Sequence, residues 1–554
     1  MKAHEAIIRI FESEGIEDVF ALMSEDTMGL LTTMQDQWGD SIELTHSRHE
    51  QGAMAMADAY SRIRDDVGVC IVGRGPAVAQ TGTSLVTARK HGSKLLVLVP
   101  EPALDTSYSA KMFQQETFLE STIGDVISIR SHDQLASDLN EAFRRVRGGD
   151  GPVAVQIPYD LMDSELPESG AIDDYRPTTE TVPMPSRTVP DDNGVVEAAS
   201  VLSDSEAPIV LAGMGAVRSN AKREIRELAK QSGALIATTL QARGYFDEDP
   251  FHVGFIGGYG HELANEYVQQ SDAVLAVGCT LNPYTTNSGR LIGEGTTLVH
   301  VDTDASNIGR HTNVDHGVVG DATITIEAIM RELETDSVAG GDKRRTDATR
   351  QRIAETSPFD QDDFEPQPDR LDPQNLIEAL DGILPEDRTV VTDAGHFACW
   401  IFDGLSVPHP DEYLWTANFG AIGQGLPMGV GAARASDERP CYAFCGDAGF
   451  MMALQELETA ARNDIPLTVF VMNDSALGAE YHRLIGDGQY GGTALIDTPE
   501  LESVAESLGA DGYTVCSRSD LAAIEDKLRR VPDGPRLVEC KMNRNARHRS
   551  RDKI

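Results

Sequence analysis

The sequence predicts an α/β protein with three doubly wound parallel sheets. Its 554 residues exceed a single domain, because domains usually hold about 100–200 residues. Short apolar runs alternate with helical segments along the chain, which is typical of parallel sheets covered by helices. Two polar stretches, 166–192 and 336–370, have the composition of linkers. We therefore expect domains at 1–165, 193–335 and 371–554.

The charge of the chain is extreme. Its 89 acidic residues and 47 Lys and Arg give a formal net charge of −42, and only ten residues are Lys. The acids are spread along the chain, which predicts a halophilic protein adapted to high salt, where screening weakens self-repulsion. A surface made for a basic partner would instead show acidic blocks. The charge argues against nucleic acid and anionic membranes as partners.

The cysteines and apolar runs indicate a protein of the cytoplasm. Seven Cys are scattered without a Cys-x-x-Cys pair, so we expect buried thiols rather than disulfides or a zinc site. The N-terminus lacks the charged-then-apolar form of a signal peptide, and no apolar run reaches the roughly 18 residues of a membrane span. We expect a cytoplasmic protein with no membrane partner.

The first expected domain alternates helices with short strands. Helices are expected at 6–14 and 52–60, and strands at 18–22, 42–46, 68–72, 94–99 and 153–157. The second strand runs into Arg48-His49-Glu50, where the helix dipole alone would favour a Glu. The third strand ends at Gly73-Arg74-Gly75-Pro76, which a tight turn alone would explain.

The middle domain is expected to hold a Rossmann-like sheet. Its strands are expected at 208–212, 234–239, 273–277 and 298–301. Gly213-Met214-Gly215 ends the first of them in the manner of a nucleotide-binding sheet. A flavin or nicotinamide site is therefore an alternative here, although a single Gly-x-Gly carries little information.

The most informative stretch lies in the last domain. An apolar run at 441–445 leads into Gly446-Asp447-Ala448-Gly449, and apolar residues at helical spacing then predict a helix at 451–461. A second apolar run, 467–472, ends at Asn473-Asp474. Strand, helix and strand in this order form a βαβ unit, in which both strands end at the same edge of the sheet.

Asp447 and Asp474 are placed together by this unit. They lie 27 positions apart and would meet at the carboxyl ends of neighbouring strands, where open α/β sheets bind ligands. Two carboxylates suit Mg2+, and free amides at the helix start can receive phosphates. Taken singly, a helix-capping Asp and an Asn-Asp turn are the more common explanations. The pair at this spacing favours a Mg-diphosphate site.

This stretch resembles the cofactor motif of thiamine-diphosphate-dependent enzymes. That motif reads Gly-Asp-Gly and, after a gap of this length, Asn-Asn; here it stands as Gly446-Asp447-Ala448 and Asn473-Asp474. The resemblance implies that Asp447, Asp474 and the carbonyl of Ala476 bind Mg2+. The implied cofactor contacts are Gly446, Ala448, Gly449 and Asn473. Asp in place of the last Asn keeps an oxygen ligand and adds a negative charge beside the diphosphate.

Arg48-His49-Glu50 resembles the Arg-His-Glu segment of the acetolactate synthase group. In that family the Glu hydrogen-bonds the ring nitrogen of the cofactor's aminopyrimidine, which leads to removal of the thiazolium C2 proton; the resemblance gives this role to Glu50. Phe113-Gln114-Gln115-Glu116 resembles the Phe-Gln-Glu segment of the same group and would turn Gln114 toward the reaction centre. Gly75 corresponds to a glycine beside the cofactor.

Further resemblances lie in the middle and last domains. His396 follows a strand in a loop near the diphosphate. The segment 418–423 resembles the one that grips the pyrimidine, so the carbonyl of Gly420 would bind the amino group and Ile422 would support the bend of the cofactor. Some acetolactate synthases carry FAD in the central domain. Their Arg-Phe-Asp-Asp-Arg loop is replaced here by 280–284, which speaks against FAD without removing it.

The resemblance covers nearly the whole chain, in the order pyrimidine-binding, central and diphosphate-binding domain. It implies carboligation, in which a 2-keto acid is decarboxylated and the enamine is added to a second carbonyl. Glu480 falls where decarboxylases keep a proton-donating carboxylate, and Glu25 and Asp26 offer a further pair of acids. A non-ligating decarboxylase or a 2-hydroxy ketone lyase is therefore an alternative, although a solvated acid at a helix start explains Glu480 equally well.

Two expectations concern the assembly. Glu50 and Asp447 lie on different domains yet serve one cofactor, and family members build such a site between two subunits. The resemblance therefore implies a homodimer or homotetramer that acts on a small 2-keto acid. A catalytically silent cofactor-binding subunit is the alternative from another class, and the presence of both Glu50 and Asp447 argues against it. A flavin- or nicotinamide-dependent oxidoreductase is the last alternative.

Overall fold

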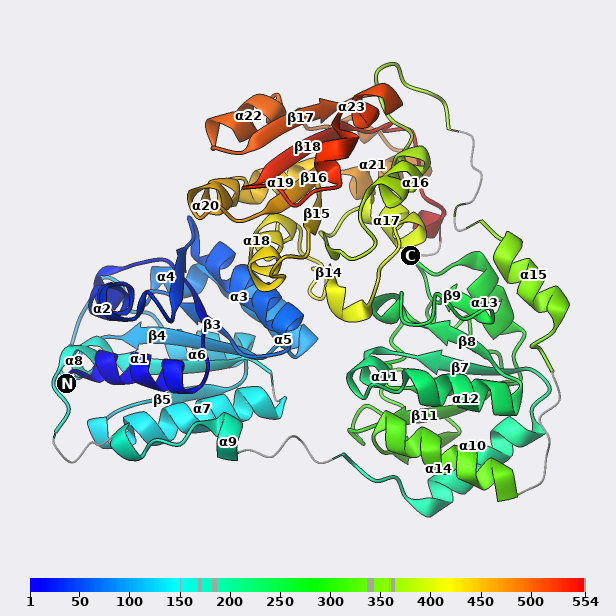
Figure 1. Ribbon diagram of the computed structural model, residues 1–554, viewed down its shortest axis with the longest axis horizontal. Helices are drawn as coiled ribbons and strands as arrows, with labels where there is room; N and C mark the ends of the chain where they lie inside the picture. The colour runs from blue at the N-terminus through cyan, green and yellow to red at the C-terminus, as the bar shows by residue number, and fades with distance from the viewer. Residues whose placement is uncertain are drawn as a thin grey trace.

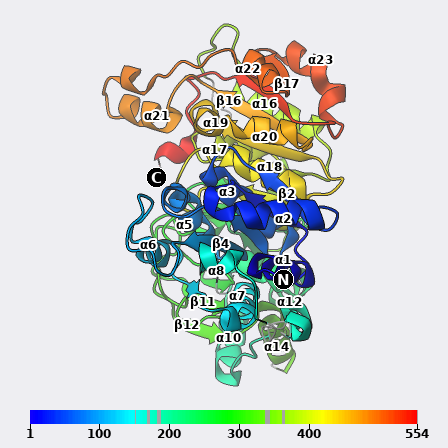
Figure 2. The same cartoon turned by 90° about the vertical axis from the view of Figure 1, so that its left-hand side faces the viewer.

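The computed structural model describes residues 1–149, 151–167, 172–181, 187–335, 343–357, 359 and 364–552. The chain forms three lobes, each built on its own sheet, and the C-terminal lobe lies above the other two (Figure 1). Figure 2 shows the same arrangement from the side of the N-terminal lobe. Parts of both expected linkers lie outside the described residues.

The first sheet has six parallel strands in the order β2-β1-β3-β4-β6-β5. The strands are β1 (Asp18–Ala21), β2 (Glu43–His46), β3 (Gly68–Ile71), β4 (Leu95–Glu101), β5 (Val126–Ser128) and β6 (Val153–Pro158). The helices are α1 (Ala3–Ser13), α2 (Met28–Trp38), α3 (Glu50–Arg64), α4 (Pro76–Gln80), α5 (Gly82–His91), α6 (Gln115–Thr122), α7 (Leu135–Gly148) and α8 (Tyr159–Asp163). β1 and β3 are buried throughout, as strands covered on both faces must be, and the one charged residue in them, Asp18 of β1, pairs with Arg434.

The second sheet is also parallel and has the order β12-β11-β10-β7-β8-β9. Its strands are β7 (Pro208–Ala212), β8 (Leu235–Thr238), β9 (His252–Phe255), β10 (Ala273–Val277), β11 (Thr297–Asp302) and β12 (His316–Val319). The helices of this part are α10 (Asp192–Asp204), α11 (Met214–Arg218), α12 (Lys222–Ser232), α13 (Glu262–Gln269), α14 (Ala322–Thr335) and α15 (Asp347–Glu355). The short helix α9 (Thr178–Thr181) lies on the first lobe, where the Thr178 hydroxyl donates to Glu14 at 2.6 Å.

The third sheet repeats the design, with the parallel order β14-β13-β15-β16-β18-β17. Its strands are β13 (Thr389–Thr392), β14 (Tyr413–Trp415), β15 (Cys441–Gly446), β16 (Leu467–Asn473), β17 (Asp511–Val515) and β18 (Arg536–Lys541). Its helices are α16 (Pro373–Ile383), α17 (Ala398–Gly404), α18 (Gly425–Ala435), α19 (Asp447–Ala453), α20 (Glu456–Arg462), α21 (Gly478–Gly486), α22 (Leu501–Ser507) and α23 (Arg518–Leu528). Single 3-10 turns include η1 (Glu25–Thr27), η2 (His132–Gln134), η3 (Ile172–Asp174), η4 (Leu240–Ala242), η5 (Pro410–Glu412), η6 (Gly491–Ala494) and η7 (Arg549–Asp552).

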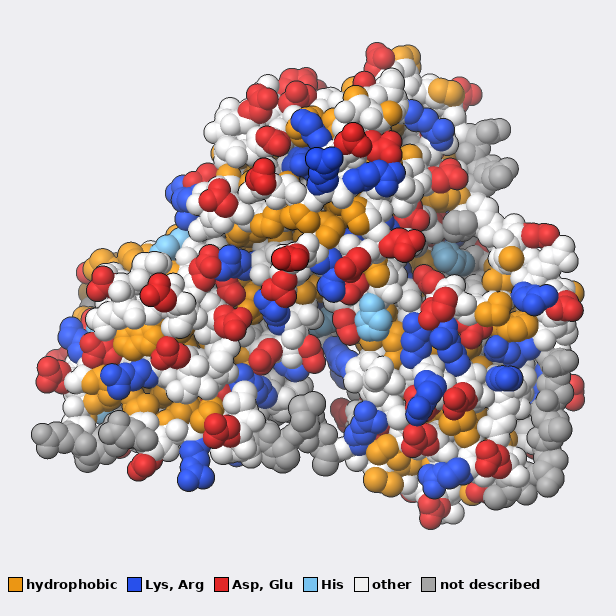
Figure 3. All heavy atoms as spheres, viewed as in Figure 1, with side chains coloured by type: hydrophobic (Ala, Val, Ile, Leu, Met, Phe, Trp, Pro, Cys, Tyr) orange, Lys and Arg blue, Asp and Glu red, His pale blue; other side chains and the backbone are white. Residues whose placement is uncertain are grey.

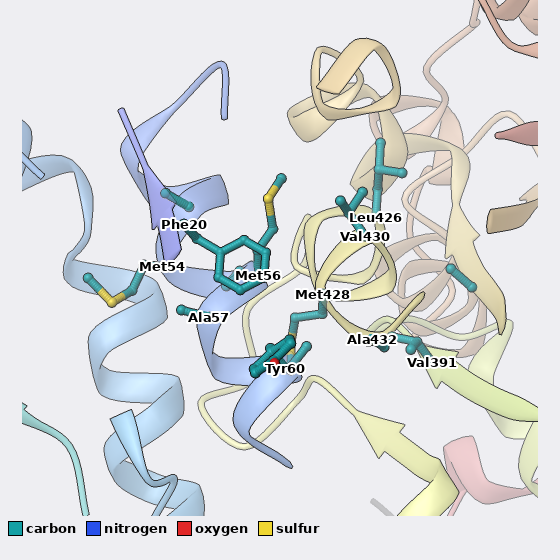
Figure 4. Close-up of a cluster of buried hydrophobic side chains, with 14 of the residues drawn as sticks. Phe20, Met54, Met56, Ala57, Tyr60, Val391, Leu426, Met428, Val430 and Ala432 are labelled. Carbon is teal, nitrogen blue, oxygen red and sulfur yellow. The ribbon is translucent and has the colours of Figure 1, made fainter. Parts of the chain in front are cut away.

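Helices α3 and α18 join the first and third lobes. Met56 and Tyr60 of α3 face Met428 of α18 in one apolar cluster that continues into both sheets (Figure 4). Gly431 allows close packing, because a Cβ there would lie 2.1 Å from the carbonyl oxygen of Met56. The two lobes of one chain therefore share a core.

The structure corrects the helix expected at 451–461. α19 begins at Asp447 itself and ends at Ala453, and α20 begins at Glu456. The apolar spacing continues across the break, which is why the pattern predicts a single helix. The first free amides of α19 therefore belong to Asp447 and its neighbours in the glycine-rich turn.

The surface and the thiols agree with the composition. Asp and Glu are distributed over all three lobes on the face in Figure 3, with Lys and Arg among them. All seven cysteines are free thiols, and every one except Cys516 is buried. Among the described residues, no helix combines the length and the apolar composition needed to cross a membrane.

Candidate functional site

The candidate site lies at the carboxyl edge of the third sheet. β15 and β16 are neighbours, with Gly446 paired to Met472, so the residues that follow them leave the sheet at the same edge. Asp447 is the first residue of α19, and Asp474 directly follows β16. The backbone thus brings the two acids together as the spacing predicts.

Burial dominates the electrostatics of Asp447. The residue is only 3% exposed. Burial raises the pKa of its carboxyl group to about 7, the charge of Asp474 adds to this shift, and the amides of Ala448 and Ser475 oppose it. Two neighbouring carboxylates with little access to water are costly to ionise together, and a divalent cation bound to both offsets the desolvation and the repulsion.

Asp474 is held by the loop that follows it and by two arginines. Burial raises the pKa of its carboxyl group to about 6, opposed by the amide of Ala476 and then by Arg544 and Arg370. The Ala476 amide donates to Oδ1 at 3.0 Å, and Nε of Arg544 donates to the Asp474 carbonyl at 2.7 Å. Sequence reasoning missed both arginines, which offset the negative charge that Asp474 adds.

Asn473 and Ala476 support this loop. The Asn473 side chain accepts a hydrogen bond from the Ser475 amide at 2.9 Å and donates one to Glu539 at 2.6 Å. Ala476 is buried and forms an isolated antiparallel bridge with Leu495. Because the Asn473 side chain is engaged within the protein, it fixes the position of its neighbour Asp474.

The glycine-rich turn packs on a buried acid, Asp393. Gly446 is the N-cap of α19, and Ala448 is half-buried within its first turn. Gly449 has no room for a side chain, because a Cβ there would lie 2.7 Å from Asp393 Oδ2. Asp393 also accepts hydrogen bonds from the Gly423 amide at 2.9 Å and from the Thr416 hydroxyl at 3.0 Å. Asp393 therefore holds together the loops that follow β13, β14 and β15. The sequence analysis did not predict this role.

His396 and Asp474 lie close together, on either side of the position where Gly478 lacks a side chain. A Cβ at Gly478 would lie 2.7 Å from Asp474 Oδ2 and 3.4 Å from the Cβ of His396. The His396 ring contacts that of His482, with centroids 4.3 Å apart. Its Nε2 accepts a hydrogen bond from the amide of His548 at 3.0 Å. The C-terminal segment is therefore docked beside the site.

Three predicted residues lie instead at the carboxyl edge of the first sheet. Glu50 is the first residue of α3 and is half-buried. Gly75 has a φ of 66° and donates its amide to Gln115 at 2.9 Å. Gln114 is exposed at the N-cap of α6, whereas its neighbour Gln115 turns inward. Within one chain, these three residues lie at the edge of the first sheet, whereas Asp447 and Asp474 lie at the edge of the third.

The loop expected to grip a pyrimidine is open at its tip. Gly420 is exposed and Ile422 is half-buried. The neighbouring residues contact the first lobe: Asn418 accepts a hydrogen bond from Arg62 at 3.1 Å, and the Lys90 ammonium lies 5.6 Å from the centre of the Phe419 ring. The loop is thus anchored on one side and accessible at Gly420.

The remaining predicted acids differ in their surroundings. Asp26 is buried in ion pairs with Arg74 at 2.8 Å and Lys111 at 3.1 Å, so it does not form the expected pair of proton donors with the exposed Glu25. The sequence interpretation overlooked these two cationic partners. Glu480 is exposed in the first turn of α21.

The edge of the third sheet fits a Mg-diphosphate group. It offers two neighbouring carboxylates, a glycine-rich turn with free amides, and arginines that offset the excess negative charge. No group of three or more His, Cys, Asp or Glu suited to a metal occurs in the described part of the chain. Mg2+ needs no such group, since one or two carboxylates, phosphate oxygens and water complete its shell.

Comparisons with known proteins identify the family. The N-terminal TPP binding domain of thiamine pyrophosphate enzymes matches residues 1–122, the central domain matches 195–329, and the C-terminal TPP binding domain matches 393–540. The chain belongs to the thiamine pyrophosphate enzyme family and is an enzyme that depends on this cofactor, also called thiamine diphosphate.

Within the family, the chain is similar along nearly its whole length to acetolactate synthases. It is 28% identical to the probable acetolactate synthase large subunit of Methanocaldococcus jannaschii, over 96% of this chain and 89% of that protein. It is 28% identical to the acetolactate synthase of Mycobacterium avium, over 96% of this chain and 86% of that protein. The acetolactate synthase large subunit of Corynebacterium glutamicum is 26% identical, with coverage of 97% and 86%. The family and branch expected from the motifs are confirmed.

Proposed function

We propose that the protein catalyses the carboligation of a 2-keto acid with thiamine diphosphate and Mg2+. The observation that carries this proposal is the neighbouring pair of buried Asp447 and half-buried Asp474 at one sheet edge, in a chain similar throughout to acetolactate synthases. When bound, thiamine diphosphate supplies the chemistry that releases CO2 from the keto acid and adds the remaining fragment to a second carbonyl. The protein supplies position, charge and proton transfer.

The metal would be held by the carboxylates of Asp447 and Asp474 and by the carbonyl of Ala476. The diphosphate would lie against the turn of Gly446, Ala448 and Gly449, near His396, where free amides at the start of α19 point to the same edge. Arg370 and Arg544 support this assignment, because they oppose the rise that burial causes in the pKa of Asp474 and so favour the charged form that binds a cation.

Glu50 would hold the ring nitrogen of the cofactor's pyrimidine through its carboxyl group. The carbonyl of Gly420 would accept a hydrogen bond from the amino group, Ile422 would support the bend of the cofactor, and Gly75 and Gln114 would line the opposite wall. The exposure of Gly420 and the half-burial of Glu50 support this arrangement, since both remain accessible to a ligand in the folded chain.

The site would form between two copies of the chain, in a homodimer or a homotetramer built from it. Large side chains are exposed in loops at the carboxyl edges of both sheets: Tyr108 (82% exposed) and Phe113 on the first, and Phe419 and Tyr490 (80% exposed) on the third. These aromatic side chains supply apolar area that an interface between subunits would bury. A second copy would cover them while bringing its own Glu50 to the acid pair.

Release of the product without ligation is the second candidate. Glu480 favours it, because this exposed carboxyl group lies in the first turn of the helix that follows Asp474, where a bound ligand could reach it. FAD is not part of the proposal. Gly213 and Gly215 pack against Gly278, where a Cβ at Gly215 would lie 2.6 Å from the Gly278 Cα, so close backbone packing accounts for the Gly-x-Gly.

The test is product analysis in high salt. Wild-type protein is incubated with Mg2+, thiamine diphosphate and pyruvate, and the products are identified by NMR, with Glu50→Gln as the inactive control. Acetolactate supports ligation, whereas acetaldehyde as the sole product moves the enzyme to the decarboxylase side. Untouched pyruvate directs the assay to other 2-keto acids. Failure to bind thiamine diphosphate contradicts the proposal.

A further inference from the structure

We infer that Glu456, on the third lobe, is a positioning residue for Glu50 on the first lobe of the same chain. The inference rests on the proposed role of Glu50 and adds a residue that fixes the direction of its side chain. Glu456 is the first residue of α20, and the segment that it contacts, Arg48 to Gly52, contains Glu50 at the start of α3.

The carboxyl group of Glu456 binds the turn that leads into α3. Its Oε2 accepts a hydrogen bond from the Arg48 amide at 3.2 Å and a second from the Thr459 hydroxyl at 2.8 Å. Glu456 is 0% exposed, so this contact lies out of water, where a hydrogen bond is stronger than at the surface. Burial raises the pKa of Glu456, and the Thr459 hydroxyl and the Arg48 amide oppose this rise, so the contact with the start of α3 favours the carboxylate form.

Gly52 keeps the space that this contact needs. A Cβ at position 52 would lie 2.5 Å from Oε1 of Glu456 and would force the carboxyl group away. Oε1 is buried and has no hydrogen-bond partner among the described residues. An acid that is buried with one oxygen unpaired costs stability. This cost is understandable if the carboxyl group serves to fix the first turn of α3.

The contact connects two functional elements of one chain. α20 follows α19 after two residues, and α19 begins at Asp447. The same helix holds the end of β2 as well, because Arg462 donates to the His46 carbonyl at 2.6 Å. The two successive helices α19 and α20 therefore connect the proposed metal ligand to the segment from which Glu50 projects.

The experiment replaces the carboxyl group and follows the function of Glu50 separately from cofactor binding. In Glu456→Ala we expect the exchange of the C2 proton of bound thiamine diphosphate, measured by NMR in D2O after acid quench, to slow by about 10-fold or more. The dissociation constant of the cofactor should change little, since Glu456 does not belong to the proposed binding turn. Hydrogen–deuterium exchange of the cofactor-free protein should show faster exchange in the peptide that contains Arg48.

Two further variants make the test specific. Gly52→Ala should slow C2 exchange as Glu456→Ala does, although Ala is the better helix former, and the double variant should be no slower than either single one. Glu458→Ala is the matched control on the same helix. It removes the ion pair of Glu458 with Arg48, whose side chain is half exposed, and should leave C2 exchange within about twofold of wild type.

The outcomes separate this inference from the proposed function. Wild-type exchange rates in a folded Glu456→Ala variant, or a loss that only follows weaker cofactor binding, would overturn the positioning role and leave the proposed function intact. Unchanged C2 exchange in Glu50→Gln would overturn the proposed function and the inference with it.

Discussion

Asp474 stands where the related motif carries Asn, and this single difference changes the pH dependence of the site. Burial raises the pKa of Asp447 to about 7 and that of Asp474 to about 6, well above the value near 4 of an unfolded chain. The stability that each protonated group contributes is present below the unfolded pKa and is lost as pH rises through the folded one. A bound cation reverses this trend, because it stabilises the charged forms.

We therefore predict that Mg2+-dependent binding of thiamine diphosphate weakens as pH falls from above 7 to below 6. Asp474→Asn should retain binding and shift this dependence to lower pH, because Asp447 loses the neighbouring charge that raises its pKa. Cofactor affinity measured by titration across this pH range checks the prediction. Asp497→Asn, an exposed acid in a nearby loop, is the control. Equal pH profiles for wild type and Asp474→Asn would contradict the assignment.

Single residues were predictable where they lie in a local pattern. Asp447 and Asp474 follow strands that the sequence shows directly, so their meeting could be derived from spacing. Glu456 and Arg544 could not, because each acts on a segment about 70 to 400 positions away. The role of Asp393 could not be predicted from the sequence either, because it depends on loops from three strands that meet at one carboxyl group.

The strands, too, divide into those that a local sequence pattern predicts and those that it does not. Central strands such as β15 and β16 are continuous apolar runs buried on both faces, and the sequence predicts them. The edge strands β5, β12 and β17 were not predicted, because each is only partly buried and carries too short an apolar pattern. The largely buried strands β9, β14 and β18 were not predicted either. Their places at or next to the sheet edges follow from packing that no local window contains.

The C-terminal segment is docked by several contacts, among them a buried histidine that carries a pH-dependent charge. The His548 Nε2 lies 2.9 Å from Asp403, and both side chains are buried. Burial alone would lower the pKa of His548, but the Asp403 carboxylate and the contact with Cys399 raise it to about 9. The raised pKa means that the stabilisation is complete below the unfolded value near 6.5 and is lost as pH rises through about 9.

We predict that the segment around His548 detaches more readily as pH rises from 6.5 to 9, with a loss on the order of 3 kcal/mol. Hydrogen–deuterium exchange of the peptide 543–552, corrected for the intrinsic rate at each pH, measures this opening. His548→Gln should be open at all pH values and show a flat profile. A wild-type segment whose protection does not change with pH would disprove the role of the charged pair.

The charge of the whole molecule gives a prediction about salt. A net charge of −42, distributed over all three lobes, repels itself in the compact state, and salt screens this repulsion. The thermal unfolding midpoint should therefore rise as KCl is increased from low to molar concentration. Sucrose at matched osmolality is the control for general solvent effects. A midpoint that is insensitive to KCl would refute adaptation to high salt.

The last prediction concerns which subunits contribute Glu50 and Asp447 to one active site. If Glu50 of one chain and Asp447 of its partner share a cofactor, Glu50→Gln and Asp447→Ala each inactivate a different half of every site. Each variant alone should be inactive, but a mixed dimer contains one site with both residues intact. Equal co-expression should restore about one quarter of wild-type activity, because half of the dimers are mixed and each has one working site of two. Tandem affinity tags isolate the mixed dimer and measure this directly. No recovery in the purified mixed dimer would place Glu50 and Asp447 of a single chain in the same site.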